Sequence, residues 1–414
     1  MKFSCDYATL VENLSDISTV AEDSMLKDDT KNVIFKFDAD GTVTLLGIVP
    51  QMLIFKRFIE KDKYRLEFSD AEKEGFQNQV NNNGVSSSLY FQIKSKELTG
   101  FLNSYKSVRR TQVEEVSFEI NERGAIRCTV LEKEKDEEGY VADDAKVHLS
   151  YWSFNNIAIR QNQMMDITIK APEEQLISVD NRFINLYTKN LLPIMQSGGT
   201  NLYSFLACGS DYIVAFDNAF TVLMANNQEG FKDVFSNMRL SYRAISFMDK
   251  VIAVNQDILV CKTDKHLYFK TDNSEAFISY DTKLPDYAAY ANAYKKDHAV
   301  LLDRIYVKDI LTRLALVNES IEVTINPELN IVNFKNSKFS QDIDITTSKA
   351  MEEMGTVHFK IAPDKLNACI IGNDTEFNFD IRIYFSRQPD GKKIAIIFTD
   401  GTGAWFSVVR VNTY

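Results

Sequence analysis

The residue types that most often carry catalysis or bind metals are few in this chain and widely spaced. Its four histidines are His148, His266, His298 and His358, and none has a second histidine or a cysteine at the spacing of a zinc site. We expect each to be an ordinary polar residue on a strand or turn. No GxSxG, HExxH or GxxxxGK(S/T) motif occurs. The sequence therefore predicts a protein that is not an enzyme and that needs no metal or cofactor.

Acidic residues and cysteines are the remaining candidates for metal binding or cross-linking. The acidic run 136–138 lies in a charged stretch, 132–144, which we expect to be an exposed loop, with a magnesium site as the alternative. The cysteines are odd in number and form no CxxC pair: Cys5, Cys128, Cys208, Cys261 and Cys369. We expect small buried apolar residues here rather than disulfides or a zinc site.

Basic residues recur on the polar faces of the predicted helices. In a helix expected over 180–196, Arg182, Asn185 and Lys189 share one side of the helix. Similar spacing links Lys106 with Arg110. A solvated helix face is the alternative reading for each helix. The first helix differs, because its polar positions include Asp6, Glu12, Ser15 and Asp16 and no basic residue.

One order of elements occurs three times along the chain and must position these helices. Near residues 1, 165 and 299 a short strand precedes an amphipathic helix and a hairpin of alternating residues. A second strand–helix–strands group follows in each copy, as in 88–94 with the helix carrying Leu98 and Leu102. This order predicts an α+β fold of repeated domains, with antiparallel sheets and paired helices, over 1–160, 161–284 and 285–414.

Composition is that of an ordinary folded domain, with 45% hydrophobic and 25% charged residues. No apolar run approaches the roughly 18 residues of a membrane span, and the first ten residues do not resemble a signal peptide. We expect a cytoplasmic protein with no membrane partner. The net charge of −11 disfavours a protein that coats nucleic acid, although it leaves open how charge is distributed.

Several segments resemble the bacterial-type β sliding clamp, the DNA polymerase III β subunit family. Segment 277–287, FISYDTKLPDY, is similar to the strand and Phe-Pro-Asp-Tyr segment that begin the family's third domain. Segment 307–319, VKDILTRLALVNE, resembles the third-domain helix that ends in an Arg-Ala-Ala-Ile-Leu-Ser-Asn-Glu type sequence. The start MKF and the final strand 404–411 fall where the family has its first and last strands. This resemblance extends over the whole chain.

The resemblance implies a ring of two head-to-tail subunits whose helices surround double-stranded DNA without reading its sequence. Encirclement holds the ring on DNA, while weak contacts from basic residues follow the phosphates. An acidic protein with a basic inner surface would then be expected. The candidates for DNA-facing cations are Lys106, Arg110, Arg182, Lys189, Arg243, Lys250, Lys308, Arg313 and Lys365.

The resemblance also implies an apolar pocket between the second and third domains, where short peptides of DNA polymerase and the clamp loader dock. The family's Thr-Asp-Gly-His-Arg-Leu loop would correspond to 216–221, where only the Asp is kept, and the Met-Pro-Met-Arg ending is replaced by VRVNTY. We therefore expect a pocket of similar place and different shape. Its candidate residues are Phe205, Phe216, Asn218, Phe220, Thr221, Pro285, Ala289, Tyr290, Lys360, Pro363, Ile394, Val408, Val409, Arg410 and Val411.

The family's subunit contact maps onto Leu316 and Val317, with a strand of the first domain near 126–130 opposite them. Leu316 lies off the main apolar stripe of its helix. Apparent insertions at 72–87 and 132–144 suit a clamp from a large virus or a remote lineage, which would place it in a host cytoplasm or replication compartment. The alternative function is a clamp-fold interaction scaffold, for example a transcription or assembly factor, that does not encircle DNA.

Overall fold

The computed structural model describes most of the chain. The described residues are 1–23, 26–27, 31–74, 88–106, 110–120, 125–136, 138–182, 184–185, 188, 192, 195, 205–209, 212–216, 220–225, 234–283, 298–314, 316–317, 319–363, 366, 381–387, 393–399 and 405–412. They form two compact units, one of residues 1–176 with 257–279, and one of residues 177–256 with 280–414.

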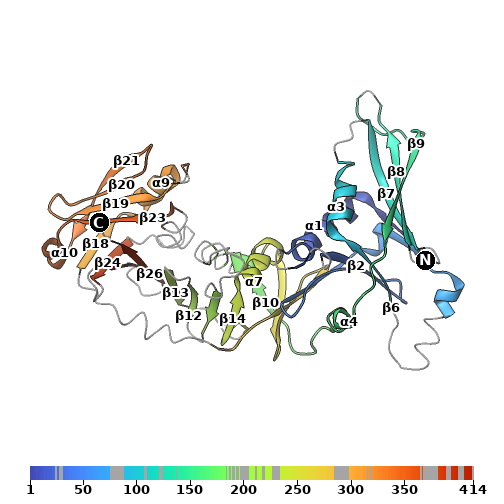
Figure 1. The fold of residues 1–414 in the computed structure, drawn as a ribbon, viewed down its shortest axis with the longest axis horizontal. Coiled ribbons are helices and arrows are strands. Elements are labelled where there is room, and N and C mark those ends of the chain that lie inside the picture. The colour runs from blue at the N-terminus through green and yellow to red at the C-terminus, as the bar shows by residue number, and fades with distance from the viewer. Residues whose placement is uncertain are drawn as a thin grey trace. The chain divides into compact units, whose positions relative to one another are not determined.

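The first unit contains two antiparallel sheets and a pair of neighbouring helices (Figure 1). One sheet has the order β5-β1-β7-β8-β9, and the other contains β15-β16-β17-β4-β3-β2-β6. Its strands are β1 (Lys2–Asp6), β2 (Asn32–Asp38), β3 (Val43–Val49), β4 (Leu53–Phe58), β5 (Tyr64–Glu67), β6 (Ser88–Lys94), β7 (Thr111–Ile120), β8 (Ala125–Glu134), β9 (Val147–Asn155), β15 (Asp257–Lys262), β16 (His266–Lys270) and β17 (Ser274–Ser279). Its helices are α1 (Tyr7–Ala21), η1 (Lys61–Lys63), α3 (Ser95–Asn103) and α4 (Gln161–Ile167).

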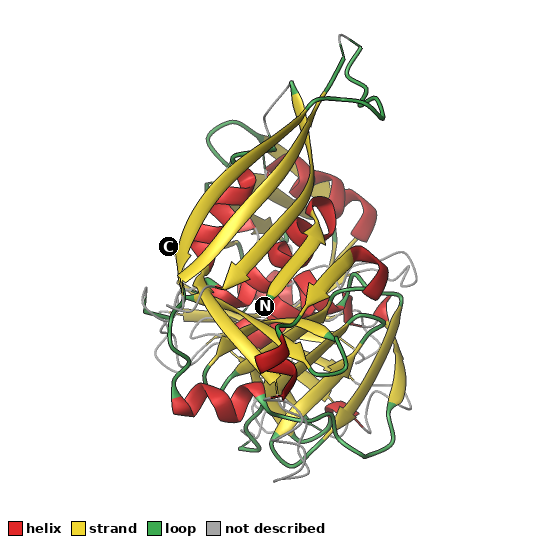
Figure 2. Cartoon of the chain, turned by 90° about the vertical axis from the view of Figure 1, so that its right-hand side faces the viewer, coloured by secondary structure: helices red, strands yellow, loops and turns green. Residues whose placement is uncertain are grey.

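Aromatic packing at the centre of the first unit joins the two sheets. Phe3 on β1, Phe35 on β2, Phe91 on β6 and Phe118 on β7 are all fully buried, and the rings of Phe35 and Phe91 stack at 4.4 Å. Buried aromatic rings contribute large apolar areas and prefer such offset contacts. The helices α1 and α3 lie beside this core, and Figure 2 shows the long yellow strands with red helices next to them.

The sheet of the first unit continues from one predicted domain into the next. Strand β17 pairs antiparallel with β4, with Ser274 opposite Arg57 and Ile278 opposite Leu53. The connecting segment after β9 folds back onto this sheet, where Ile167 on α4 is buried with Ile34, Ile54 and Phe277. The first unit is therefore one body built from sequence that we assigned to two domains.

The second unit is built in the same way around a long antiparallel sheet, β14-β11-β12-β13-β26-β25-β24-β18-β22, and a smaller one, β21-β20-β19-β23. Its strands are β10 (Ile177–Asp180), β11 (Phe205–Cys208), β12 (Tyr212–Phe216), β13 (Phe220–Ala225), β14 (Met238–Ser241), β18 (His298–Leu302), β19 (Ile321–Asn326), β20 (Ile331–Lys335), β21 (Ser340–Asp344), β22 (Thr346–Thr347), β23 (Val357–Ile361), β24 (Ile381–Arg387), β25 (Lys393–Thr399) and β26 (Trp405–Asn412). Its helices are α7 (Tyr242–Phe247), the π-helical turn η2 (Met248–Ile252), α9 (Arg304–Leu314) and α10 (Lys349–Met354).

Most predicted strands and helices are confirmed, but the strand predicted at 166–170 is wrong. That segment holds the end of α4, and the strand follows at β10. The apolar alternation of Ile167 and Ile169 arises because both pack on the outer side of the sheet of the first unit. The three domain boundaries remain a prediction.

The expectation that 132–144 is an exposed loop is also wrong in part. Strand β8 continues to Glu134, and Glu132 is buried, accepting hydrogen bonds from Thr111 at 2.7 Å and Ser150 at 3.1 Å. Residues 138–146 lie between β8 and β9, and Tyr140 there is exposed. A buried carboxylate in this position is held by hydroxyl donors, which is a structural role.

The cysteines in the described core should not react in the folded protein. Burial raises the pKa of Cys5 and of Cys128 to about 12, so their thiolates are scarce at neutral pH. We expect a small alkylating reagent at about pH 8 to leave both unmodified until denaturant is added. Peptide mapping by mass spectrometry resolves each site, and fast modification of either cysteine in the native protein would contradict the packing described.

Candidate nucleic-acid interface and contact edges

Helices α1 and α3 form the candidate DNA-facing surface of the first unit. Asp6 caps α1 by accepting a hydrogen bond from the Thr9 amide at 2.8 Å, and Leu10, Leu14 and Ile17 are buried at helical spacing. Tyr7 donates from its hydroxyl to the carbonyl of Leu102 at 2.8 Å. Packing and this hydrogen bond hold the two helices as a pair.

A polar groove of about 230 Å³ lies between these two helices. Its lining residues are Val11, Leu14, Ser15, Ser18, Glu22, Thr99, Leu102, Asn103 and Lys106. Lys106 is the one cation in that lining, and Glu22 is its one carboxylate. The exposed side of α1 carries Glu12, Ser15, Thr19 and Glu22, so the acidic first helix expected from the sequence is confirmed.

The cations predicted on the first unit are exposed. The helical spacing expected for Lys106 and Arg110 is wrong, because α3 ends at Asn103. Lys106 follows the helix, and Arg110 immediately precedes β7, where its carbonyl accepts a hydrogen bond from the Lys135 amide at 2.8 Å. Exposed cations such as these can contact phosphates without being buried. Their role in DNA binding remains a prediction.

In the second unit the helical residues 181, 182, 184, 185 and 188 lie next to α7 and η2. Asn185 donates to the Ala253 carbonyl at 3.0 Å, and Thr188 donates to Asp249 at 2.7 Å. Asn185 is thus a packing residue and not part of an exposed polar face. Arg182 is 81% exposed but forms an ion pair with Asp180 at 2.6 Å, and Lys250 is exposed.

Helix α9 buries Val307, Ile310 and Leu314 and leaves Lys308 and Arg313 exposed, as its periodicity predicts. Arg313 donates to the side chain of Gln341 on β21 at 3.2 Å, so it lies beside that strand. Arg243 is half-buried at the start of α7. Lys189 and Lys365 lie outside the described residues.

Leu316 is strongly exposed, and it follows α9 next to an open sheet edge. Its side chain is 85% exposed, whereas Val317 is half-buried. Strand β21 ends its sheet and, in the part of the chain described, pairs with β20 alone. An exposed leucine beside unpaired backbone groups is typical of a surface that another chain covers.

The first unit has a matching open edge at β9, not at 126–130. Ile126, Cys128 and Val130 are fully buried on β8, which is paired on both sides with β7 and β9. Strand β9 ends the sheet and exposes Val147, Leu149, Tyr151 and Trp152, each by about half. The alternation of apolar residues from 147 to 151 was the sequence signal that could have identified this edge.

The predicted peptide-pocket residues gather around neighbouring strands of the long sheet in the second unit. In the register of this sheet Phe205 lies opposite Phe216, Phe220 opposite Val409, Thr221 opposite Val408, and Ile394 opposite Val411. Arg410 lies opposite Ala395 on the same pair of strands.

Strand β23 contacts β26 and brings Lys360 close to these strands. Lys360 forms an ion pair with Glu322 at 2.7 Å, and Pro363 is half-buried. Asn218, Pro285, Ala289 and Tyr290 lie outside the described residues.

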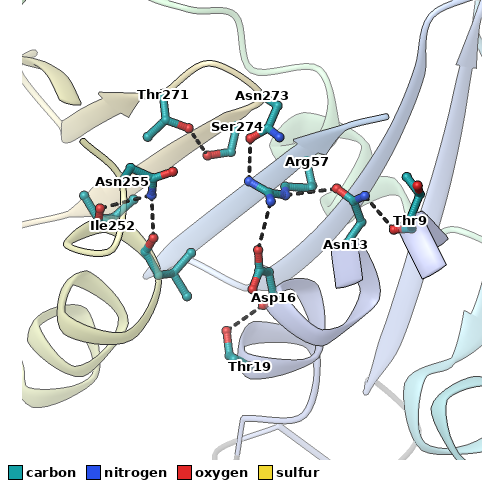
Figure 3. A network of polar contacts seen from close by, with 11 residues as sticks. Thr9, Asn13, Asp16, Thr19, Arg57, Ile252, Asn255, Thr271, Asn273 and Ser274 are labelled. Carbon is teal, nitrogen blue, oxygen red and sulfur yellow. Dashed lines mark hydrogen bonds and ion pairs between the residues drawn. The ribbon is translucent and has the colours of Figure 1, made fainter. Parts of the chain in front are cut away.

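Two buried cations on β4 were missed by the sequence reasoning. Arg57 is 9% exposed and contacts Asn13 and Asp16 on α1 (Figure 3). Lys56 is 8% exposed and donates to the carbonyl of Ile169 at 2.5 Å on the opposite side of the sheet. Burial lowers the pKa of Lys56, and nearby Glu275 opposes this effect. The sequence could have indicated these two residues, because they are adjacent charges within the otherwise apolar strand LIFKRF.

Replacing Asp16 should change the pH dependence of stability in a defined direction. Burial raises the pKa of Asp16, Arg57 lowers it and Glu12 raises it, with a net increase above 3.8. A raised pKa means that the folded state binds the proton more tightly than the unfolded state. We expect the stability of the wild type to rise relative to that of Asp16→Asn as pH falls through the raised value towards 3.8. Urea unfolding of both proteins at about pH 7 and about pH 4.5 measures this difference, and the opposite slope would contradict it.

The four histidines all lie on strands, as expected: His148 on β9, His266 on β16, His298 on β18 and His358 on β23. Among the described residues, no group of three His, Cys, Asp or Glu side chains is placed to hold a metal ion. Within the same part of the chain, no helix combines the length and apolar character of a bilayer span.

Comparison with known proteins identifies the fold. No protein-family model matches the chain, and no curated protein sequence matches it. Solved structures do match over the whole length. A putative DNA polymerase III β subunit from Eubacterium rectale is 12% identical with a TM-score of 0.65, and all of each chain is covered.

The DNA polymerase sliding clamp of Bacillus subtilis is 12% identical with a TM-score of 0.63, again with full coverage of both chains. The DNA polymerase III β subunit of Borrelia burgdorferi is 9% identical with a TM-score of 0.66, covering 100% of this chain and 98% of the other. Sequence identity this low establishes the fold and leaves the sites to be argued from this chain's own residues. The chain has the fold of the DNA polymerase III β subunits, the bacterial sliding clamps.

Proposed function

We propose that this protein is a DNA sliding clamp, in which two copies close head to tail around double-stranded DNA and tether a polymerase. The observation that carries the proposal is the pair of open sheet edges in a chain that has the clamp fold over its whole length: β9, with exposed apolar side chains, and β21, with the exposed Leu316 following α9 in the same unit. A heterologous contact between two different edges generates a closed ring when its rotation closes. The protein would act as a binding scaffold without an active site.

The chemistry of the two edges supports their pairing between subunits. On one side are Leu149 and Tyr151 on β9, with the Arg127 guanidinium 4.5 Å from the centre of the Tyr151 ring. On the other are Leu316 and the exposed carboxylates Asp342 and Asp344 of β21. Apolar contacts would supply affinity, and the opposite charges would favour this orientation. Arg313, beside β21, belongs with this contact rather than with the DNA-facing set.

DNA binding would be weak, independent of sequence and carried by exposed cations. Lys106, Lys250 and Lys308 are exposed on or beside helices of the two units, and Arg110 is exposed immediately before β7. Contacts of this kind to phosphates permit sliding, because each is exchanged easily for a counterion. Persistence on DNA would come from encirclement.

Partner enzymes would dock through short peptides at the strands β13, β26 and β25 of the second unit. The pocket candidates on these strands are adjacent in register, and Lys360 on β23 lies near them. A peptide of DNA polymerase or of the clamp loader would place apolar side chains there. Because the loop 216–221 keeps only Asp217 of the family pattern, the preferred peptide would differ from bacterial ones.

One observation favours the second candidate, a clamp-fold scaffold that does not encircle DNA. The exposed side of α1 carries Glu12 and Glu22 and no cation, and such a surface repels phosphates. A clamp tolerates one repulsive helix when cations on others balance it. The scaffold would need no ring.

The size of the protein in solution tests the ring most simply. Light scattering with size-exclusion chromatography should give a mass twice the chain mass of 47.3 kDa, over a range of concentrations. A protein that stays at the mass of one chain at every concentration would exclude a closed two-subunit ring. A dimer that adds no processivity to any polymerase would favour the scaffold.

A further inference from the structure

Arg57 lies at the end of β4 with its guanidinium buried beneath α1. Its Nε donates to Asn13 Oδ1 at 2.9 Å, its Nη1 donates to Asn273 Oδ1 at 2.5 Å, and its Nη2 lies 3.3 Å from Asp16 Oδ2 (Figure 3). Three nitrogens of one planar group thus reach three different side chains. A lysine has one nitrogen and cannot reproduce this arrangement.

The acceptors belong to segments far apart in the sequence. Asn13 and Asp16 lie on α1, which follows the first strand of the chain, whereas Asn273 lies in the turn between β16 and β17. Both sets lie within the first unit. Arg57 therefore links the first helix to strands that we predicted to belong to the second domain.

Both sides of this link are held rigidly in advance. In the turn, Thr271 and Ser274 are buried with their hydroxyls 2.6 Å apart, and the Thr271 amide donates to the Ser274 carbonyl at 3.0 Å. On α1, the side chain of Asn13 donates to the Thr9 carbonyl at 2.7 Å. Asn273 and Asn13 are thus presented to Arg57 in fixed orientations.

The strand pairing at this junction leaves one degree of freedom that Arg57 can fix. Backbone hydrogen bonds between β4 and β17 set the register, but the twist between neighbouring strands varies by tens of degrees among sheets. A link from β4 up to the helix and across to the β16–β17 turn restricts that twist. The adjacent Lys56 acts on the opposite side of the sheet, where its Nζ holds the carbonyl of Ile169 in the connecting segment.

We infer that Arg57 is a positioning residue that fixes the orientation of α1 relative to strands β15–β17. The inference rests on the proposed function in one respect, because the orientation matters for whether the ring closes. A subunit with a looser junction presents its β9 edge over a range of directions and loses affinity for the next subunit. The angle between the two predicted domains is then set by side chains as well as by backbone pairing.

Two variants separate this role from general stability. Asn273→Ala removes the hydrogen bond between Arg57 and the β16–β17 turn and leaves the contacts of Arg57 with α1 intact. Ser18→Ala is the matched control, because it removes a side-chain hydrogen bond on the same helix, to the Leu14 carbonyl at 2.7 Å, and touches neither Arg57 nor its three partners. Arg57→Lys keeps the positive charge but cannot contact all three side chains at once.

The first readout is the distance between two spin labels within the first unit. Labels attached to unnatural amino acids at Ala8 on α1 and Lys265 before β16 avoid the native cysteines, and both sites are exposed. Asn273→Ala and Arg57→Lys should broaden the distance distribution, while Ser18→Ala should leave it as in the wild type. An unchanged distribution in Asn273→Ala and Arg57→Lys would overturn the inference.

The second readout is the dissociation constant of the two-subunit ring. Asn273→Ala should raise it about tenfold, the equivalent of one hydrogen bond to a charged group, and Ser18→Ala should leave it within about twofold. Equal effects of the two alanine variants would show general destabilisation and overturn the inference. A wild-type protein that is a monomer would sink the proposed function alone, since the label distances still test the role of Arg57.

Discussion

Leu316→Glu should convert the proposed two-subunit ring into monomers. The leucine is 85% exposed in the single chain, and in a closed ring it would lie against the apolar residues of β9. Placing a carboxylate in such a contact costs at least about 3 kcal/mol, so the dissociation constant should rise by about 100-fold or more. Sedimentation velocity over a concentration series measures this change.

Leu329→Glu is the matched control for Leu316. Leu329 is 65% exposed in the same unit, in the connection between β19 and β20. Its replacement should leave the dissociation constant unchanged. A Leu316→Glu protein that stays dimeric, or equal weakening by both substitutions, would show that the contact lies elsewhere on the molecule.

Neutralising Lys106, Lys250 and Lys308 together should weaken DNA binding and reduce its salt dependence. Each phosphate contact that is lost lowers the slope of log affinity against log salt by about one, so three substitutions to glutamine act strongly together. All three side chains are exposed, and their removal should not change folding. Fluorescence anisotropy of a labelled duplex at several salt concentrations gives both quantities.

A single-charge control tests whether position matters in the DNA experiment. Lys349→Gln removes an exposed cation at the start of α10, outside the candidate set. It should have less effect on the slope than any one of the three substitutions. The same slope in the triple variant and the wild type would remove these residues from the DNA-facing surface.

Alternating apolar residues made most of the fold predictable. The strand β6 was expected at its observed bounds, 88–94, because residues alternate along a strand between a packed side and an open side. Buried Leu10, Leu14 and Ile17 made α1 equally clear. The strand prediction for 166–170 failed because Ile167 ends a helix and Ile169 follows it, yet both side chains pack against the sheet. Alternation of apolar residues alone cannot distinguish this arrangement from a strand.

The candidate site was less predictable, because it depends on which edges and charges the fold leaves uncovered. Helical spacing identified Lys308 and exposed Leu316, but the same spacing placed Asn185 on a polar face when it bonds to Ala253. Identifying β9 rather than 126–130 as the open edge required knowledge of the strand order. Arg57 stands out in the sequence as a charge within an apolar strand, but its partner Asn273 could not be identified, because it lies 216 residues away in the sequence.

Retention on circular DNA tests encirclement most directly. The protein is first threaded onto linear DNA, the DNA is closed by ligation, and the complex is isolated at about 1 M salt, where the Debye length of about 3 Å suppresses ordinary phosphate contacts. A restriction enzyme then cuts the circle in a portion of the sample. We predict that the protein stays with closed circles through gel filtration and is lost from the cut DNA. Equal retention before and after cutting, or no retention on closed circles, would contradict encirclement.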